Sequence, residues 1–520
     1  MKIFSFSPFG YEGAVVAVDV DLRRGIPAVD IVGLADNAVK ESRERMRSAI
    51  LNSGYEFPKE RVLISLSPAD MRKEGAGFDL PIAVAVLHAE QIKKSADDQQ
   101  KLFGTVGSVL VMGELDLSGN VRSVRGVHAA VLTAKENGIS CCIVPKGNYQ
   151  EAVVSQMHIY GVENLKEAFE CLSKIQDGKE LKTEVIEPQC EDEVCFAPPA
   201  ENMDYSTVKN QGILLRGLQI AAAGFHNLMV YGPPGCGKTL AVQRLPSILP
   251  LLTLSESQTV TRIYSLAGLL PAGSSRISQR PFRQPHQTSS LEGMSGGGVL
   301  CRPGEISLAH NGVLFLDEAA EFRTSVLQGL RIPLETGFVT LSRAGRHTTY
   351  PAQFQLIIAT NPCPCGNYGS ESKICLCSAR SVEFYWKKFS APLLDRIDIR
   401  VPVLGKSEKD AEYSRYNNIS TEELRQDIAR AVKTQRLRQG KMNALLSPEE
   451  VRKIIRLDKD CEGLVEESCL EENFSARGMC SIKKLARTIA DMAGIKDILP
   501  EHIEEAVFFR KNTGGLDFCL

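Results

Sequence analysis

The chain has 520 residues, of which 43% are hydrophobic and 24% charged, with a formal net charge of −2. This length predicts about two to four domains. The charge balance excludes a broadly basic protein, so any contact with nucleic acid must be local. The chain start lacks the apolar core of a signal peptide, no uncharged apolar run is long enough to span a membrane, and fifteen cysteines favour reduced thiols in the cytoplasm.

Three segments near the N-terminus carry a family resemblance: residues 113–121 (GELDLSGNV), 125–128 (RGVH) and 143–146 (IVPK). They resemble the proteolytic domain of Lon, which implies an α+β fold of the ribosomal S5 domain 2-like type. Lon works with a Ser-Lys dyad. Here Gly75 or Ala76 stands in the serine's place and His128 in the lysine's. Without a nucleophile there is nothing to activate, so we predict a noncatalytic module that supports the assembly or binds a protein partner. Ser65 or Ser67 as a substitute nucleophile is the alternative.

Residues 173–205 have the composition of a linker. The segment is polar and acidic and contains Pro188, Pro198 and Pro199, and such clusters mark connections between packed units. Cys190 and Cys195 lie within it without a second pair of ligands, so we predict no metal there.

A phosphate loop follows the apolar run at residues 228–231. It reads GPPGCGKT and consists of Gly232, Pro233, Pro234, Gly235, Cys236, Gly237, Lys238 and Thr239. The glycines let backbone N–H groups crowd around an oligophosphate, and the helix that begins there adds its positive dipole end. The Lys238 ammonium can reach the β- and γ-phosphates, and the Thr239 hydroxyl can bind Mg²⁺. The pattern therefore predicts a site for ATP and Mg²⁺.

Two further apolar runs predict buried parallel strands that end near the same site. The first, residues 312–316, is followed by Asp317 and Glu318, and the second, residues 354–360, by Asn361. A phosphate-loop ATPase uses one carboxylate in the Mg²⁺ shell and one to orient the attacking water. The Asn361 amide can contact the γ-phosphate or that water. The alternative is that these are core strands with ordinary surface carboxylates.

Two stretches contain arginine but neither Asp nor Glu, and they are the predicted DNA contacts. Residues 257–291 carry Arg262, Arg276, Arg280 and Arg283, and residues 336–370 carry Arg343, Arg346 and His347. The second stretch reads as a hairpin, with strands at 338–341 and 347–350. Arginines at a hairpin tip can grip phosphates without reading bases. The alternative is that these arginines meet the nucleotide or acidic faces of neighbouring subunits.

Four cysteines follow the second strand closely: Cys363, Cys365, Cys375 and Cys377. Four thiols in one short loop can wrap a tetrahedral Zn²⁺ ion. The pairs are Cys-x-Cys, a less usual spacing than Cys-x-x-Cys. The alternative is a reduced loop whose cysteines only pack.

The motif set as a whole resembles the ComM/YifB family of magnesium-chelatase-like AAA+ ATPases. The segments that carry the resemblance are residues 232–239, 280–290 (RPFRQPHQTSS), 302–318 (RPGEISLAHNGVLFLDE), 359–366 (ATNPCPCG) and 390–398 (SAPLLDRID). It implies a multidomain α/β protein with the Lon-like domain at 1–172, the linker at 173–205, an AAA+ core at 206–400 and a helical lid and C-terminal domain at 401–520. It also implies a homo-hexameric ring with ATP at the subunit interfaces and the arginine-bearing stretches facing a central pore.

The family's site residues carry over by position. Lys238 and Thr239 match the phosphate loop, Asp317 the Mg²⁺ ligand, Glu318 the general base and Asn361 the sensor 1 position. The family pattern is not perfectly kept, because Asn210 stands where glycine is usual and Gln287 where a second histidine often follows His286.

Two arginines carry over from the family as well. Arg396 resembles the finger that enters the neighbouring subunit's site, where a cation stabilises transition-state charge; the alternative is a local salt bridge with Asp395 or Asp398. Arg477 resembles the sensor 2 arginine of the lid, and Arg487, on the same predicted helix, is the competing candidate.

These motifs leave more than one function open. The first is a DNA motor, since the family's best-understood role is DNA branch migration during recombination in natural transformation. The second is a protein-remodelling or chelatase-type ATPase whose N-terminal domain recruits a protein client and whose hydrolysis is indifferent to nucleic acid. A nucleotide-locked regulatory assembly is a third, against which Glu318 and Arg396 both argue.

Overall fold

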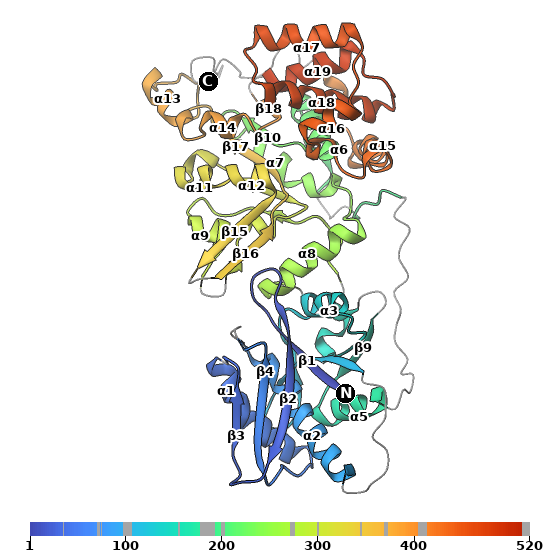
Figure 1. Cartoon of the computed structure of the whole chain (residues 1–520). Coiled ribbons are helices and arrows are strands. Elements are labelled where there is room, and N and C mark those ends of the chain that lie inside the picture. The colour runs from blue at the N-terminus through green and yellow to red at the C-terminus, as the bar shows by residue number, and fades with distance from the viewer. Residues whose placement is uncertain are drawn as a thin grey trace.

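A computed structural model of the chain shows three regions that lie one above another (Figure 1). The described residues are 1–34, 36–69, 73, 75–96, 107–153, 157–176, 193–198, 203–270, 276–298, 301–343, 346–368, 373–403 and 413–511. Most of the predicted linker, including Pro188, Cys190 and Pro199, lies outside them. Among the described helices, none combines the length and the apolar character that crossing a bilayer requires.

The N-terminal region is built on a seven-stranded mixed sheet in the order β3-β4-β2-β1-β5-β8-β9. Its strands are β1 (Lys2–Ser7), β2 (Ala14–Arg23), β3 (Val29–Val32), β4 (Arg61–Ser67), β5 (Ser108–Val111), β8 (Cys141–Pro145) and β9 (His158–Val162). Its helices are α1 (Asn37–Asn52), α2 (Asp79–Ala96), α3 (Val127–Glu136), α4 (Tyr149–Ala152) and α5 (Leu165–Gln176), and β6 (Glu114–Leu115) pairs with β7 (Val121–Arg122). β4 shows why the sheet forms: Val62, Ile64 and Leu66 alternate with less buried residues, so one face of the strand enters the core.

The middle region is a five-stranded parallel sheet in the order β11-β14-β17-β10-β18. The strands are β10 (Leu228–Tyr231), β11 (Phe282–Arg283), β14 (Val313–Leu316), β17 (Gln355–Thr360) and β18 (Ile399–Pro402). All residues of β10, β14 and β17 are buried, as expected for parallel strands covered on both faces. The carboxyl ends of these three strands meet at one edge, which is where such sheets bind ligands.

Short helices and two hairpins surround this sheet. The helices are α6 (Gly212–Gly224), α7 (Lys238–Gln243), α8 (Leu254–Ala267), α9 (Leu291–Ser295), α10 (Glu305–Leu308), α11 (Thr324–Gly329), α12 (Arg331–Thr336), α13 (Ala379–Lys387) and α14 (Ala391–Leu394). The hairpins are β12 (Gly296–Gly297) with β13 (Arg302–Pro303), and β15 (Phe338–Arg343) with β16 (Arg346–Pro351).

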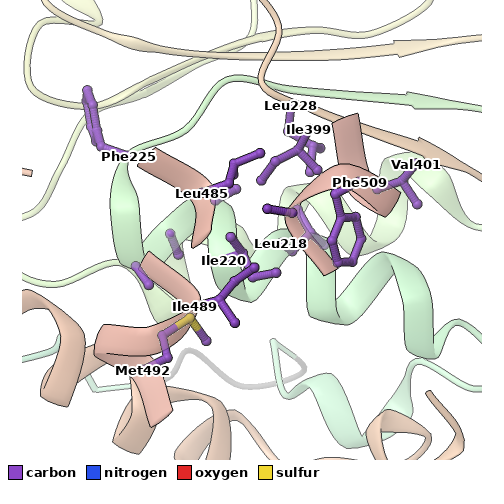
Figure 2. Close-up of a cluster of buried hydrophobic side chains, with 14 of the residues drawn as sticks. Leu218, Ile220, Phe225, Leu228, Ile399, Val401, Leu485, Ile489, Met492 and Phe509 are labelled. Carbon is purple, nitrogen blue, oxygen red and sulfur yellow. The ribbon is translucent and has the colours of Figure 1, made fainter. Parts of the chain in front are cut away.

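The C-terminal region is helical and packs on the middle region. It contains α15 (Thr421–Gln439), α16 (Pro448–Ile454), α17 (Lys459–Glu471), α18 (Ala476–Ala493) and α19 (Pro500–Lys511). Figure 2 shows the shared core, in which side chains of α18 and α19 meet those of α6 and β18: Leu485, Ile489, Met492, Phe509, Leu218, Ile220, Ile399 and Val401. Burial of each such side chain contributes about 1.5–3 kcal/mol to stability, so this shared core stabilises the packing of the helical region on the middle region. The predicted α/β protein with a parallel sheet and a helical C-terminal region is confirmed.

The N-terminal region contacts the middle region through its β1–β2 turn. The guanidinium of Arg262, on α8, donates to the carbonyl oxygens of Tyr11 (3.0 Å) and Glu12 (2.9 Å) and lies 4.7 Å from the centre of the Tyr11 ring. The backbone N–H of Tyr11 donates to Thr348 Oγ1 on β16 at 3.0 Å. The turn therefore touches both α8 and the β15–β16 hairpin, on the side of the core that faces the N-terminal region (Figure 1).

Candidate functional site

The phosphate loop connects the end of β10 to the start of α7. Gly235 and Gly237 have φ angles of 81° and 82°, in the left-handed region that favours glycine. At Gly232 a Cβ atom would lie 2.1 Å from the Val403 carbonyl oxygen, so a side chain does not fit. The three glycines thus let the backbone turn tightly before α7 begins at Lys238.

Lys238 and Thr239 extend from this loop toward the neighbouring strands. The Lys238 ammonium donates to the carbonyl oxygens of Gly232 (2.6 Å) and Pro233 (2.7 Å) and lies 3.4 Å from Asn361 Oδ1. Burial lowers the pKa of this lysine. The Thr239 hydroxyl donates to Asp317 Oδ1 at 3.1 Å. Residues that follow β10, β14 and β17 therefore converge on one point.

A cavity of about 340 Å³ opens at this point. Its lining consists of Pro234, Gly235, Gly237, Lys238, Thr239, Leu240, Asp317, Glu318, Ala359, Thr360 and Asn361. Glu318 is exposed and has a φ of 48°, a conformation that costs a residue with a side chain about 1–3 kcal/mol and is typical of functional sites. The predicted Mg²⁺ ligands, general base and sensor 1 residue thus surround one cavity.

Arg396 and Arg477 lie elsewhere. Both form an ion pair with Glu335 on α12, Arg396 through Oε2 and Arg477 at 3.7 Å from Oε1, and the Arg396 guanidinium lowers the pKa of that carboxyl. They line a separate cavity of about 710 Å³. Within the described residues, neither arginine belongs to the lining of the phosphate-loop cavity. The local partner of Arg396 is Glu335, not Asp395 or Asp398 as the alternative supposed.

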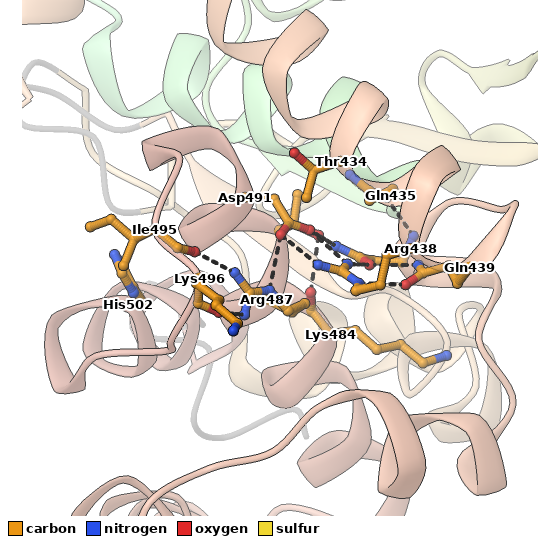
Figure 3. A network of polar contacts seen from close by, with 12 residues as sticks. Thr434, Gln435, Arg438, Gln439, Lys484, Arg487, Asp491, Ile495, Lys496 and His502 are labelled. Atoms are coloured by element: carbon orange, nitrogen blue, oxygen red, sulfur yellow. Dashed lines mark hydrogen bonds and ion pairs between the residues drawn. The ribbon is translucent and has the colours of Figure 1, made fainter. Parts of the chain in front are cut away.

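Arg487 is part of the fold of the helical region. Figure 3 shows its guanidinium bonded to Asp491 Oδ1 (3.0 Å) and to the carbonyl oxygens of Ile495 (2.7 Å) and Lys496 (2.6 Å). Arg438 binds the same carboxylate at 2.7 Å. Only 8% of the Arg487 side chain is exposed, against 39% for Arg477. The choice between the two sensor 2 candidates stays a prediction.

Two arginines predicted to contact DNA, Arg280 and Arg283, each pair with a carboxylate of the fold. The Arg280 guanidinium is 2% exposed and donates to Glu256 and to the carbonyl oxygens of Pro250 and Asn311. Arg283 donates twice to Glu305, at 2.7 and 2.8 Å. Both carboxylates lie outside the acid-free stretch in sequence but fold against it. The pairs do not favour a DNA contact for Arg280 or Arg283, and that contact stays a prediction.

The predicted hairpin is present and longer than expected. Its strands pair in register from Phe338 opposite Pro351 to Arg343 opposite Arg346, which leaves only two residues for the turn; these, and the side chains of both arginines, lie outside what the structure describes. His347 is exposed and its Nδ1 lies 2.6 Å from Ser342 Oγ. The hairpin is a two-stranded sheet separate from the parallel sheet.

The positions compared with the Lon dyad, Gly75, Ala76 and His128, hold neither a serine nor a lysine. His128 is buried on α3, with its Nδ1 at 3.0 Å from the Glu151 carbonyl oxygen, and burial lowers its pKa. Gly75 has a left-handed φ of 94°, and the Ala76 side chain is outside the described part. Ser65 and Ser67 lie on β4. The prediction that this region is noncatalytic stays a prediction.

Sequence reasoning missed two residues that shape the site. Glu335, which joins Arg396 and Arg477, carries no motif, because its partners are far away along the chain. Gln211 donates through its side-chain amide to the Cys236 carbonyl oxygen inside the phosphate loop. Asn210, noted as a departure from glycine, has a φ of 58°, a conformation that asparagine adopts more readily than other side chains.

Three family models match the chain. They are described as "Magnesium chelatase, subunit ChlI" at residues 204–411, "Subunit ChlI of Mg-chelatase" at residues 18–148 and "Magnesium chelatase, subunit ChlI C-terminal" at residues 418–510.

Relatives match over nearly their whole length. The YifB protein of Salmonella typhimurium is 37% identical over 96% of this chain and 95% of its own. The competence protein ComM of Haemophilus influenzae is 34% identical over 98% of this chain and 97% of its own. The Rv2897c protein of Mycobacterium tuberculosis is 37% identical over 99% of each chain. The chain belongs to the ComM/YifB family of magnesium-chelatase-like AAA+ ATPases.

Proposed function

We propose that this chain is an ATP-driven motor that assembles into a hexameric ring and acts on DNA, as in branch migration during recombination or natural transformation. The observation that carries the proposal is that Arg396 and Arg477 line a different cavity from Lys238. An arginine finger must reach the γ-phosphate. Each ATP site then takes its arginines from a neighbouring copy, and head-to-tail contacts of this kind can close into rings.

The phosphate-loop cavity has the donors that ATP and Mg²⁺ require. The Thr239 hydroxyl and the Asp317 carboxylate, in contact at 3.1 Å, are hard oxygen ligands of the kind Mg²⁺ prefers. Bound with ATP, Mg²⁺ neutralises charge on the phosphates. Lys238 binds the β- and γ-phosphates, Asn361 holds the γ-phosphate or the water, and Glu318 orients that water and accepts its proton. Zn²⁺ at the four cysteines would not contact the ATP or the water and is a separate proposal.

In this proposal, Glu335 positions Arg396 and Arg477 for contact with the ATP site of the neighbouring subunit. It is exposed, and it pairs with Arg396 and Arg477 at once. In the assembled ring, the triphosphate of the next subunit competes with this carboxylate for the same two cations. DNA passes along the pore, where we place the β15–β16 hairpin. The N-terminal region, of S5 domain 2-like type and without a dyad, supports the ring or holds a protein partner.

Mixing inactive variants tests the shared site. Arg396→Ala and Lys238→Ala should each lose about 10³-fold or more in turnover. Mixed in equal amounts and allowed to exchange, they should recover activity, since about a quarter of random interfaces combine an intact loop with an intact finger. Lys238→Ala mixed with Glu318→Gln is the matched control, because both changes damage the same side of the interface. If neither mixture recovers ATPase activity, and the wild-type protein hydrolyses ATP as a monomer, the proposed ring is wrong.

ATPase measurements with DNA test the substrate. We expect single-stranded, duplex or four-way DNA to stimulate hydrolysis, and the stimulation to fall steeply with salt. Sizing with and without nucleotide should be done on the same samples. Hydrolysis indifferent to every DNA would favour the protein-remodelling alternative, in which the β1–β2 turn that contacts the hairpin conveys the state of a client bound at the N-terminal region.

A further inference from the structure

The four cysteines between β17 and α13 form a compact cluster. Their Sγ atoms all lie within 4.8 Å of one another. The distances from Cys363 are 3.4 Å to Cys365 and 3.7 Å to Cys375, and Cys365 lies 3.6 Å from Cys375. These distances are far longer than a disulfide bond of about 2.05 Å, so the four side chains are thiols around a common centre.

The spacing of the sulfur atoms fits one metal ion. In a tetrahedral site with Zn–S bonds of about 2.3 Å, neighbouring sulfurs are about 3.8 Å apart, close to the three distances here. An iron–sulfur cluster spreads its thiolates over several iron atoms and needs a wider cage. Four sulfur ligands also select a soft or borderline ion such as Zn²⁺ over Mg²⁺ or Ca²⁺.

The backbone around the cluster is arranged to support thiolates. The N–H of Tyr368 donates to Cys363 Sγ at 3.3 Å. A hydrogen bond of this kind orients a metal ligand and offsets part of the negative charge of four thiolates around one dication.

The cluster lies beside the nucleotide cavity. Cys363 is buried two residues after Asn361, and Gly366 of the same loop packs so closely that a Cβ atom there would lie 2.7 Å from Pro234 Cδ in the phosphate loop. On the other side, the Trp386 indole N–H of α13 donates to the Pro362 carbonyl oxygen at 2.9 Å. The loop is thus held between the phosphate loop and α13.

We propose that Cys363, Cys365, Cys375 and Cys377 bind one Zn²⁺ ion as a tetrathiolate, and that this ion fixes the loop that positions Asn361 against the phosphate loop. Binding forms four Zn–S bonds, and the thiol protons leave to solvent. All four positions of the ion are filled by sulfur, so the site is closed and structural. Whether the four cysteines bind Zn²⁺ does not depend on the motor function proposed above.

Elemental analysis of the full-length protein, purified without chelators, tests the site. We expect about one zinc per chain, and almost none in Cys375→Ser/Cys377→Ser. The matched control is Cys171→Ser/Cys195→Ser, which removes two thiols outside the loop and should keep its zinc. Metal-free wild-type protein, iron in place of zinc, or unchanged zinc in Cys375→Ser/Cys377→Ser would overturn the site.

Two further measurements use the wild-type protein and so test the site even if Cys375→Ser/Cys377→Ser fails to fold. In the wild-type protein, titration with a mercurial reagent should release zinc in step with four thiols, and Co²⁺ exchanged into the site should give the spectrum of a tetrahedral thiolate complex. Release without thiol modification would overturn the ligand set. For the link to Asn361, folded Cys375→Ser/Cys377→Ser should lose at least about tenfold in ATP turnover, and turnover equal to that of the control variant would overturn it.

Discussion

The two arginine-bearing stretches look alike in sequence and differ in the structure. Arg280 and Arg283 of the first stretch each find a carboxylate outside it, Glu256 and Glu305. The second stretch contains the β15–β16 hairpin, which forms a two-stranded sheet of its own in the described part of the chain. A stretch free of acids in sequence is therefore not free of them in space. An arginine is available to a ligand when its element projects from the core, and local charge counts do not report this.

The largest effect that this comparison predicts is on stability. Arg280→Ala removes the guanidinium that donates to the Glu256 carboxylate and to the carbonyl oxygens of Pro250 and Asn311, and breaking a buried pair in this way costs about 3 kcal/mol or more. Urea unfolding followed by the fluorescence of Trp386, the single tryptophan, should show the loss. The exposed Arg302→Ala is the control and should change stability by less than about 0.5 kcal/mol. A stable Arg280→Ala protein that lost only its response to DNA would reverse our assignment.

Some residues of the candidate site could be predicted from the sequence and others could not. Lys238, Thr239, Asp317 and Asn361 sit at the ends of apolar runs, and the geometry of a parallel sheet brings such ends together, so their meeting could be anticipated. Ion pairs set by tertiary packing could not be predicted from the sequence. The pair between Glu335 and Arg396, for example, depends on how α12 lies against the end of α14. Their roles in catalysis stay predictions.

A second, smaller change in stability depends on pH and concerns His310, which lies next to Asn311, a partner of Arg280. Burial lowers the pKa of His310 from its ordinary 6.5 to about 4, and its Nδ1 accepts the Gln353 N–H at 3.0 Å. The folded protein keeps this imidazole neutral, while the unfolded chain binds a proton below pH 6.5. Its contribution to stability is complete above about pH 6.5 and is lost as the pH falls toward 4, with about 2 kcal/mol lost by pH 5.

Urea midpoints at pH 7 and pH 5 measure this dependence. His310→Gln should be less stable at pH 7 but should lose less than the wild type between the two values. His347→Gln, on the exposed face of the hairpin, is the matched control and should follow the wild type. If all three proteins lose the same amount, His310 does not cause the acid sensitivity.

Both stretches meet at Tyr11, and a smaller effect is expected there. Its ring lies below the Arg262 guanidinium and packs edge-on against Tyr350 at 6.0 Å. Tyr11→Ala removes contacts worth about 1 kcal/mol and should speed hydrogen exchange of the β15–β16 amides about fivefold. Tyr11→Phe keeps the ring and should exchange like the wild type. Unchanged exchange in Tyr11→Ala would mean that the N-terminal region does not steady the hairpin.

The smallest effect on stability should come from the hairpin tip, where the effect on function is greatest. The free energy of unfolding of Arg343→Ala/Arg346→Ala should lie within about 0.5 kcal/mol of the wild-type value, because these two residues form the last pair of the hairpin strands, next to the turn. The double variant should keep basal ATP hydrolysis and lose its stimulation by DNA. The slope of the logarithm of DNA affinity against the logarithm of salt concentration should fall by about 0.9 for each phosphate contact removed. Arg302→Ala/Arg323→Ala removes the same charge from exposed positions of the core and should keep both. Equal losses in the two double variants would mean that DNA responds to overall charge, and retained stimulation in Arg343→Ala/Arg346→Ala would exclude the hairpin as the DNA element.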